Sequence, residues 1–153
     1  MKCKHFKIYE LVSEIVYNKY GETAWQFFDD RLLETLDAIR EHFGKGMTIN
    51  NWYWKKLNND EDNVLDERGY RCNLDYLVWS KTKKNVPYCS QHMHGRAVDF
   101  NISKMSSNDV YDEIIRNRHK FPYIRRIENK KDATSWTHID LANIEEEFKI
   151  FNT

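Results

Sequence analysis

Residues 90–100 read SQHMHGRAVDF, a histidine-rich turn at Gly95 followed by an apolar run that predicts a β-strand. Successive side chains of a strand point to opposite faces, so Ala97 and Asp99 share one face and the larger apolar side chains share the other. We therefore expect the carboxylate of Asp99 to point into a cleft floored by the small side chain of Ala97. Such a cleft has room for an ion.

A second strand is predicted in residues 135–141, SWTHIDL, where His138 and Asp140 share one face. His138 joins His92 and Asp99 of the first stretch to give two imidazoles and one carboxylate. Three protein ligands with a fourth position left for water are typical of catalytic rather than structural zinc. The same three residues are also compatible with surface histidines and a capping aspartate, so the trio taken alone leaves a zinc site open.

The remainder of the chain predicts an α+β fold. Apolar residues recur at helical spacing in two N-terminal segments that end at Gly21 and Gly44. The expected elements are helices over 6–20 and 24–43, a strand over 47–49, a helix capped by Ser106, a hairpin of strands 123–128 and 135–141, and a last helix over 143–151. We expect one domain, residues 1–153, in which a small antiparallel sheet carries the zinc site and packs against helices.

Composition excludes several classes of protein. The chain has 153 residues with 24 basic and 24 acidic side chains, so its zero net charge argues against binding nucleic acid or anionic lipid. No stretch approaches the roughly 18 apolar residues of a membrane span, and no signal peptide is visible, so we expect synthesis in the cytoplasm. The odd number of cysteines, with no closely spaced pair, predicts reduced thiols, with Cys72 and Cys89 mostly buried.

The pattern SxHxxGxAxD at residues 90–99, with WxH at 136–138 and GYRC at 69–72, resembles the M15 family of zinc D-Ala-D-Ala carboxypeptidases and phage cell-wall endopeptidases. It also resembles the zinc site of hedgehog signalling domains, which share that fold. The similar region, about residues 69–140, covers nearly half of the chain. The helices expected before residue 44 carry no such motif.

The resemblance implies that His92, Asp99 and His138 bind one zinc ion and that Arg71 lies beside the scissile bond or the substrate carboxylate. It implies hydrolysis of peptide bonds in peptidoglycan stem peptides, as a D-Ala-D-Ala carboxypeptidase or an L-Ala-D-Glu type endopeptidase. By analogy we expect a monomeric phage lysis or phage-structural enzyme that reaches the cell wall after release from the cytoplasm. The guanidinium fork of Arg71 suits a carboxylate or a developing oxyanion.

The general base is open at this level. M15 enzymes usually carry an acid three residues before the last histidine, and here that position is Ser135. Glu128 and Asp132 are the two candidates. A hairpin register that opposes Glu128 to Trp136 puts Glu128 on the same face as His138, whereas a slip of one residue turns it away. Asp132, six residues before His138, would have to reach in from a polar loop.

Four further residues are candidates for supporting roles. Ser90 is expected to orient Asp99 or the turn through a hydrogen bond, and Asp140 to accept a hydrogen bond from a ligand imidazole. Gln91 is expected to face the substrate. Trp136 is expected to form a wall of the cleft.

Two expectations concern alternatives and charge. Without the usual acid before His138, a non-catalytic binding module of hedgehog type, stabilised by zinc, is the alternative function.

Basic residues crowd between 116 and 131, and we expect part of this stretch, including Arg125 and Arg126, to flank the cleft and attract the carboxylates of stem peptides.

Overall fold

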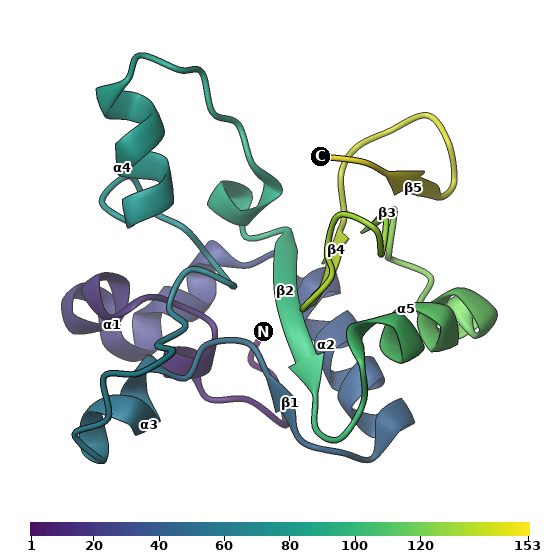
Figure 1. Ribbon diagram of the computed structural model, residues 1–153, viewed down its shortest axis with the longest axis horizontal. Helices are drawn as coiled ribbons and strands as arrows, with labels where there is room; N and C mark the ends of the chain where they lie inside the picture. Colours follow the sequence, from purple (N-terminus) through teal and green to yellow (C-terminus); the bar gives the residue numbers. More distant parts are fainter.

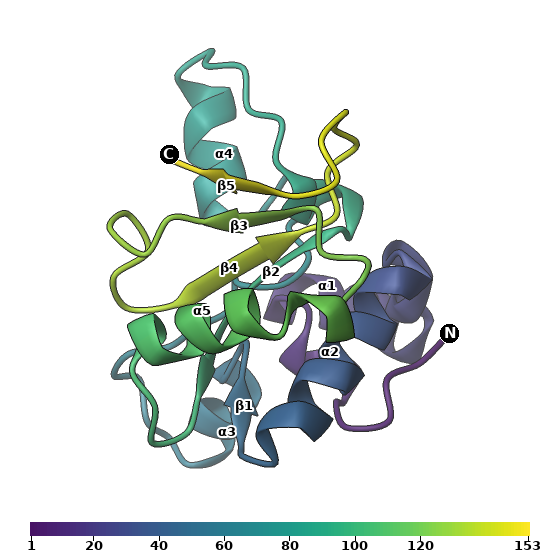
Figure 2. The same ribbon diagram turned by 90° about the vertical axis from the view of Figure 1, so that its right-hand side faces the viewer.

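A mixed five-stranded sheet organises the protein, as seen in a computed structural model that describes residues 1–153 (Figures 1 and 2). The strands lie in the order β1-β2-β4-β3-β5. Their bounds are β1 (Met47–Thr48), β2 (Ala97–Ile102), β3 (Arg126–Glu128), β4 (Thr137–Asp140) and β5 (Lys149–Phe151). The predicted α+β class is confirmed. The pairs β1-β2, β2-β4 and β4-β3 are antiparallel, whereas β5 runs parallel to β3, so the expectation of an antiparallel sheet is wrong at this edge.

Five α-helices and four short 3-10 helices surround the sheet. The α-helices are α1 (Glu14–Tyr20), α2 (Asp30–Phe43), α3 (Trp52–Leu57), α4 (Tyr76–Lys83) and α5 (Ser107–Arg116). The 3-10 helices are η1 (Ile8–Glu10), η2 (Gly21–Phe27), η3 (Gln91–His94) and η4 (Arg118–Lys120). The helix α4 stands away from the others in both views (Figures 1 and 2). None of the helices has the length and apolar character needed to cross a membrane.

The hydrophobic core lies between one face of the sheet and the helices α2 and α5. Val98 and Phe100 of β2 are buried there, with Ile139 of β4. Leu36 of α2 and Ile114 of α5 are completely buried in the same core. The predicted alternation of β2 is therefore correct, because its large apolar side chains pack on this face and leave Asp99 on the other.

The helix α2 has a well-defined beginning and end. Asp29 caps it by accepting the backbone N–H of Arg31, and Gly44 ends it with a left-handed φ of 58°. The expected start at residue 24 is wrong, because residues 21–27 form η2 and Phe28 takes an extended conformation. Capping, and not the apolar stripe, decides where this helix begins.

The expected helix over 6–20 is interrupted. Only η1 and α1 are helical there, and Val12 between them forms a β-bridge with Tyr70, far along the chain. A long-range backbone contact thus overrides the local helical periodicity. The expected stop at Gly21 is correct, and the helix capped by Ser106 is confirmed as α5, since Ser106 Oγ accepts the N–H of Asp109.

The C-terminal segment is not the helix expected over 143–151. It bends back and forms β5, in register with β3 from Arg126 to Glu128. The guanidinium of Arg125 donates to the carbonyls of Ile144 and Glu146, each at 2.7 Å. Those carbonyls would be acceptors inside a helix, so Arg125 favours the bent conformation.

The thiols are free, as predicted. Cys3 is buried and Cys72 is half-buried. The expectation that Cys89 is buried is wrong, because it lies exposed in the loop before η3, where no element packs over it.

Candidate metal centre

The face of the sheet opposite the helices α2 and α5 carries a row of polar side chains across three strands. Asp99 on β2 pairs with His138 on β4. The strand β3 lies on the other side of β4, and there Ile127 pairs with Ile139. Continuing this register by one residue along β3 puts Glu128 opposite His138. Cβ atoms of directly opposed residues lie about 4.5–5.5 Å apart. The sheet therefore sets Asp99, His138 and Glu128 side by side.

The predicted hairpin register is off by two residues. In the structure Glu128 lies opposite His138, whereas the register expected from the sequence puts it opposite Trp136. A shift of two residues keeps each side chain on its face, since the period of a strand is two. The predicted consequence, that Glu128 shares a face with His138, is therefore what the structure has.

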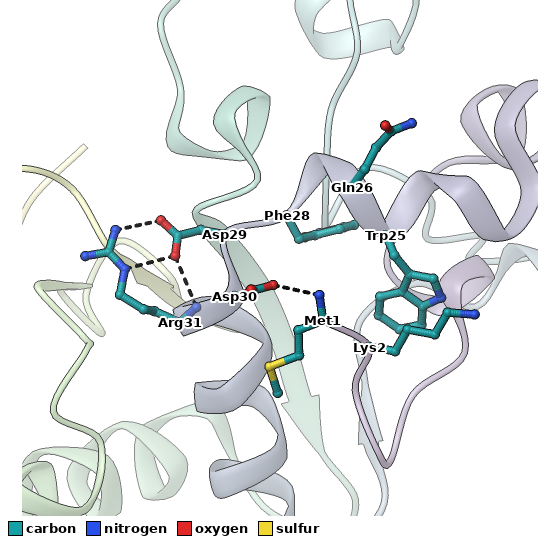
Figure 3. Close-up of a pocket in the computed structure, with 8 residues that line it drawn as sticks. All are labelled: Met1, Lys2, Trp25, Gln26, Phe28, Asp29, Asp30 and Arg31. Carbon is teal, nitrogen blue, oxygen red and sulfur yellow. Dashed lines mark hydrogen bonds and ion pairs between the residues drawn. The ribbon is translucent and has the colours of Figure 1, made fainter.

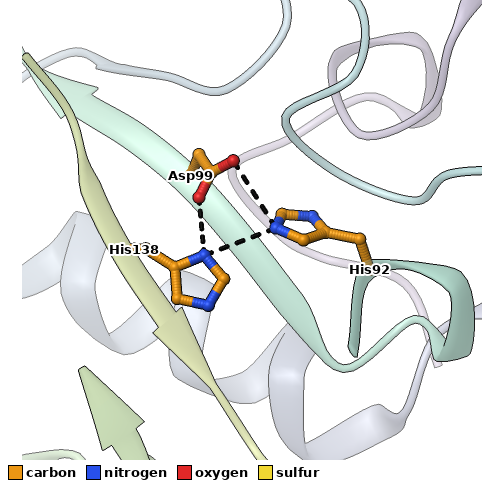
Figure 4. A group of neighbouring side chains, drawn as sticks. All are labelled: His92, Asp99 and His138. Atoms are coloured by element: carbon orange, nitrogen blue, oxygen red, sulfur yellow. Dashed lines mark hydrogen bonds and ion pairs between the residues drawn. The ribbon is translucent and has the colours of Figure 1, made fainter. Parts of the chain in front are cut away.

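Three possible ligand atoms converge at the centre of this row (Figure 4). His92 enters from η3, where its Nε2 lies 3.4 Å from His138 Nδ1 and 3.5 Å from Asp99 Oδ2. His138 Nδ1 lies 2.6 Å from Asp99 Oδ1. All three residues are buried and could hold a metal ion.

The outward nitrogen of each imidazole has a partner that fixes the tautomer. His92 Nδ1 lies 2.8 Å from the carbonyl of Gly69, which can only accept, so that nitrogen carries the proton. His138 Nε2 lies 3.2 Å from Asp140 Oδ2 and donates to that carboxylate in the same way. His92 Nε2 and His138 Nδ1 are thereby left to face each other and Asp99. Metal-binding histidines in proteins are held by such outer partners.

The electrostatics of the group are dominated by burial and by the close charges. Burial acts to raise the pKa of Asp99, but the neighbouring His92 and His138 outweigh it and hold that pKa well below its usual range. Burial acts to lower the pKa of His138, yet hydrogen bonds to Asp140 and Asp99 raise it to about 9. Burial lowers the pKa of His92. A metal ion bound here would therefore displace a proton from His138.

Arg71 forms a wall of the site. Its Nη2 donates to Asp99 Oδ2 at 3.0 Å and its Nη1 to the hydroxyl of Tyr88 at 2.9 Å. Its Nε donates to the carbonyl of Glu67. These three contacts fix the guanidinium plane beside the carboxylate. Tyr88 carried no sequence signal, because it comes from an irregular loop.

A cleft of about 420 Å³ opens above these residues. It is lined by most of the sequence-predicted site residues, namely Arg71, Ser90, Gln91, His92, Asp99, Glu128, Trp136, His138 and Asp140. Asp132 is outside this set and lies exposed in the loop between β3 and β4. Of the two candidate bases, only Glu128 faces the cleft.

Ser90 and Gln91 lie at the rim of the cleft. Ser90 Oγ accepts the backbone N–H of His92 at 3.3 Å, so it orients the turn and not Asp99. Gln91 Oε1 is buried without a hydrogen-bond partner. Gln91 thus lines the cleft, but its amide oxygen is closed off from solvent.

Asp140 has a second partner that the sequence did not indicate. Arg126 on β3 donates to it through Nε at 3.0 Å and Nη2 at 2.7 Å. Burial acts to raise the pKa of Asp140, but His138 and Arg126 outweigh it and lower that pKa. The basic stretch predicted that Arg126 flanks the cleft, which it does, but not that it pairs with Asp140.

The C-terminal strand closes one side of the cleft. Phe151 on β5 packs with its ring 5.5 Å from that of His138, and the guanidinium of Arg126 lies 4.6 Å from the Phe151 ring centre. Thr153 Oγ1 donates to Glu128 Oε1 at 2.9 Å. These residues were missed because a helix was expected in this segment.

A separate hollow of about 480 Å³ lies next to the cleft. Arg71, Leu77, Asp99 and Trp136 line both. The rest of its lining is mixed, with Val64, Leu65 and Tyr76 beside the charged Asp66, Glu67 and Arg68.

A hollow larger than the cleft, of about 890 Å³, lies elsewhere, around Trp25 and the start of α2 (Figure 3). Its charged groups are already paired. The amino group of Met1 lies 2.9 Å from Asp30, and Arg31 pairs with Asp29 at 2.6 Å. This hollow lacks a set of converging reactive side chains, so we place the candidate site at the histidine pair.

No family model, no curated protein and no solved structure matches this chain.

Replacing Gly69 with alanine is expected to weaken both the fold and metal binding. A Cβ atom at this position would lie 1.9 Å from the carbonyl oxygen of Leu11, so the backbone must move. The carbonyl of Gly69 that holds His92 would move with it. We expect a loss of about 1–3 kcal/mol in the free energy of unfolding and a loss of about 10–100-fold in metal affinity.

Chemical denaturation and a competitive zinc titration measure the two effects. Gly46→Ala is the matched control, because a Cβ atom there would meet only Ser103 Cβ at 3.5 Å, an ordinary contact. Equal behaviour of the two alanine variants would show that the packing of Gly69 against Leu11 does not position His92.

Proposed function

We propose that this protein is a zinc-dependent peptidase that hydrolyses peptide bonds in peptidoglycan stem peptides, as a carboxypeptidase or an endopeptidase. The observation that carries the proposal is the convergence of His92 Nε2, His138 Nδ1 and Asp99 at the floor of a cleft, with both imidazole tautomers fixed from outside. The choice of peptidoglycan rests on the resemblance of the motifs to the M15 family.

The donor set fits zinc. Zinc–nitrogen distances of about 2.0–2.1 Å in a tetrahedron correspond to about 3.3 Å between ligand atoms. The separations of His92 Nε2 from the other two ligands, 3.4 and 3.5 Å, are close to that value. The shorter contact of His138 with Asp99 is a hydrogen bond whose proton the ion would replace. When bound, zinc supplies Lewis acidity toward a peptide carbonyl and lowers the pKa of a water molecule.

Glu128 is the general base in this proposal. It lies beside His138 in the sheet, is only 7% exposed and lines the cleft. Its carboxylate would take a proton from the attacking water and return it to the leaving amine. The hydrogen bond from Thr153 orients one oxygen and leaves the other for this role.

Arg71 would bind the negative charge of the substrate. It is held in the cleft wall by Tyr88 and Glu67, and it shares Asp99 with the proposed ion. A guanidinium in a fixed orientation can bind a terminal carboxylate or stabilise the oxyanion that develops at the scissile carbonyl.

The test is digestion of purified peptidoglycan by the zinc-loaded protein, followed by mass spectrometry of the muropeptides. We expect about one equivalent of zinc per chain. We also expect muropeptides in which one specific peptide bond of the stem peptide has been cleaved. The position of Ser135, where M15 enzymes usually have the acid, favours the alternative of a non-catalytic zinc-stabilised module. Stoichiometric zinc without any cleaved muropeptide would support that alternative and overturn the peptidase proposal.

Replacing Arg71 with lysine is expected to lower kcat/KM by about 10–100-fold, because an ammonium keeps the charge but loses the fork of donors. Steady-state kinetics on a stem peptide measure the effect. Arg116→Lys is the control, since Arg116 is exposed on α5. An unchanged kcat/KM in Arg71→Lys would rule out a geometric role for the guanidinium.

A further inference from the structure

A second pocket, of about 270 Å³, lies away from the metal cleft and is dominated by arginines. Arg31, Arg96 and Arg125 line it, and no acidic side chain does. The rest of its lining is Pro122, Tyr123, Leu141, Ala142 and Asn143. Three guanidinium groups at one small pocket make it strongly electropositive.

Strand alternation separates this pocket from the metal cleft. Arg126 and Asp140 line the cleft, so the adjoining Arg125 and Leu141 point to the opposite face of the sheet. The expectation that Arg125 flanks the cleft is therefore wrong, and it holds only for Arg126. The backbone N–H of Leu141 donates to the carbonyl of Arg96 at 2.9 Å, which ties the third arginine to the same end of the sheet.

The positive charge of the pocket is only partly balanced. Asp29 is the shared counter-ion of Arg31, at 2.6 Å, and of Arg96, at 3.2 Å. Figure 3 shows Arg31 reaching from the start of α2 toward Asp29, on the side away from Met1. One carboxylate thus faces two guanidinium groups.

Arg125 adds a charge with no carboxylate partner. Its Nη2 is used by the carbonyls of Ile144 and Glu146, and its Nε is buried with no hydrogen-bond partner. With Asp29 counted, the three arginines leave an excess of two positive charges.

We propose that this pocket binds a phosphate group, either as the free ion or as a monoester. The three guanidinium groups come from three different segments, at the start of α2, before β2 and before β3. A tetrahedral dianion presents oxygens in several directions and can satisfy all three, whereas a planar carboxylate is satisfied by a single bidentate arginine. The pocket volume suits a compact ligand of this kind.

Isothermal titration of the full chain with inorganic phosphate, and separately with glycerol 3-phosphate, tests the proposal at constant ionic strength. We expect saturable binding, and an affinity about tenfold or more weaker in both Arg96→Gln and Arg125→Gln. Binding of both probes indicates a monoester site, and binding of inorganic phosphate alone indicates a site for the free ion. Arg125→Gln also removes contacts to the C-terminal segment and could unfold the protein. In that case the result for Arg96→Gln alone decides the test.

Lys131→Gln is the matched control, because Lys131 is exposed in the loop between β3 and β4 and does not line the arginine pocket. It removes the same charge and should leave the affinity unchanged. Equal weakening by all three variants would show a general charge effect, and unchanged affinity in Arg96→Gln would place phosphate elsewhere, for example in the metal cleft. Either result, or equal binding of acetate, overturns the proposal.

Discussion

Glu128→Gln is expected to lower kcat on peptidoglycan stem peptides by about 10²–10⁴-fold, the range found when a general acid–base group is removed. Glutamine has the shape of glutamate but cannot take a proton from water. Its amide oxygen can still accept the hydrogen bond that Thr153 donates to Glu128. The fold of the cleft and its zinc content should therefore stay as they are, while turnover falls.

Asp132→Asn separates the two acids that the sequence left open. Asp132 is exposed in the loop between β3 and β4, outside the cleft, so this variant should keep wild-type kcat. Release of muropeptides measured by mass spectrometry, with zinc content measured on the same samples, decides between them. A normal rate in Glu128→Gln together with a collapsed rate in Asp132→Asn would reverse the assignment.

Gly95→Ala is expected to destabilise the protein by about 2–5 kcal/mol, combining overpacking with a left-handed backbone that alanine disfavours. Gly95 has a φ of 63°, and a Cβ atom there would lie 1.9 Å from the carbonyl oxygen of Phe27. Its own carbonyl accepts the N–H of Asp29, the cap of α2. The turn between η3 and β2 is thus locked against the start of α2.

Gly44→Ala is the matched control for this loss. Gly44 has a similar φ of 58°, but a Cβ atom there would have no neighbour within 4 Å. Only the backbone preference is lost in this variant, at about 1–2 kcal/mol. Urea denaturation of the two variants measures the difference. Equal losses would mean that the close approach of Gly95 to Phe27 relaxes at no cost, and that the turn tolerates a side chain.

The N-terminal half gains a role that its sequence did not show. Gly69 packs against Leu11, and Gly95 packs against Phe27. These two glycines flank the candidate metal centre, and Gly69 supplies the carbonyl that holds His92. Helical periodicity indicated only a core for these segments. Their contacts with the two glycines appear only once the chain is folded, because the partners are distant in sequence.

Local patterns predicted best where the structure depends on neighbouring residues. The cap at Ser106 predicted α5, because capping is an interaction between residues three apart. The helix expected over 143–151 failed for the opposite reason. That segment has helix-forming residues, but pairing with β3 and the contacts of Arg125 override the preference.

Alternation along each strand predicted that Asp99 shares a face with Ala97 and that His138 shares a face with Asp140, because side-chain direction in a strand is a local property. The sequence by itself therefore determined the α+β class and the three residues that converge. Only the tertiary structure decided which acid joins them, since the β3–β4 register brings Glu128 beside His138 and leaves Asp132 in solvent. The outer partners Gly69 and Arg126 and the separate arginine pocket likewise depend on contacts between distant segments, which no local pattern encodes.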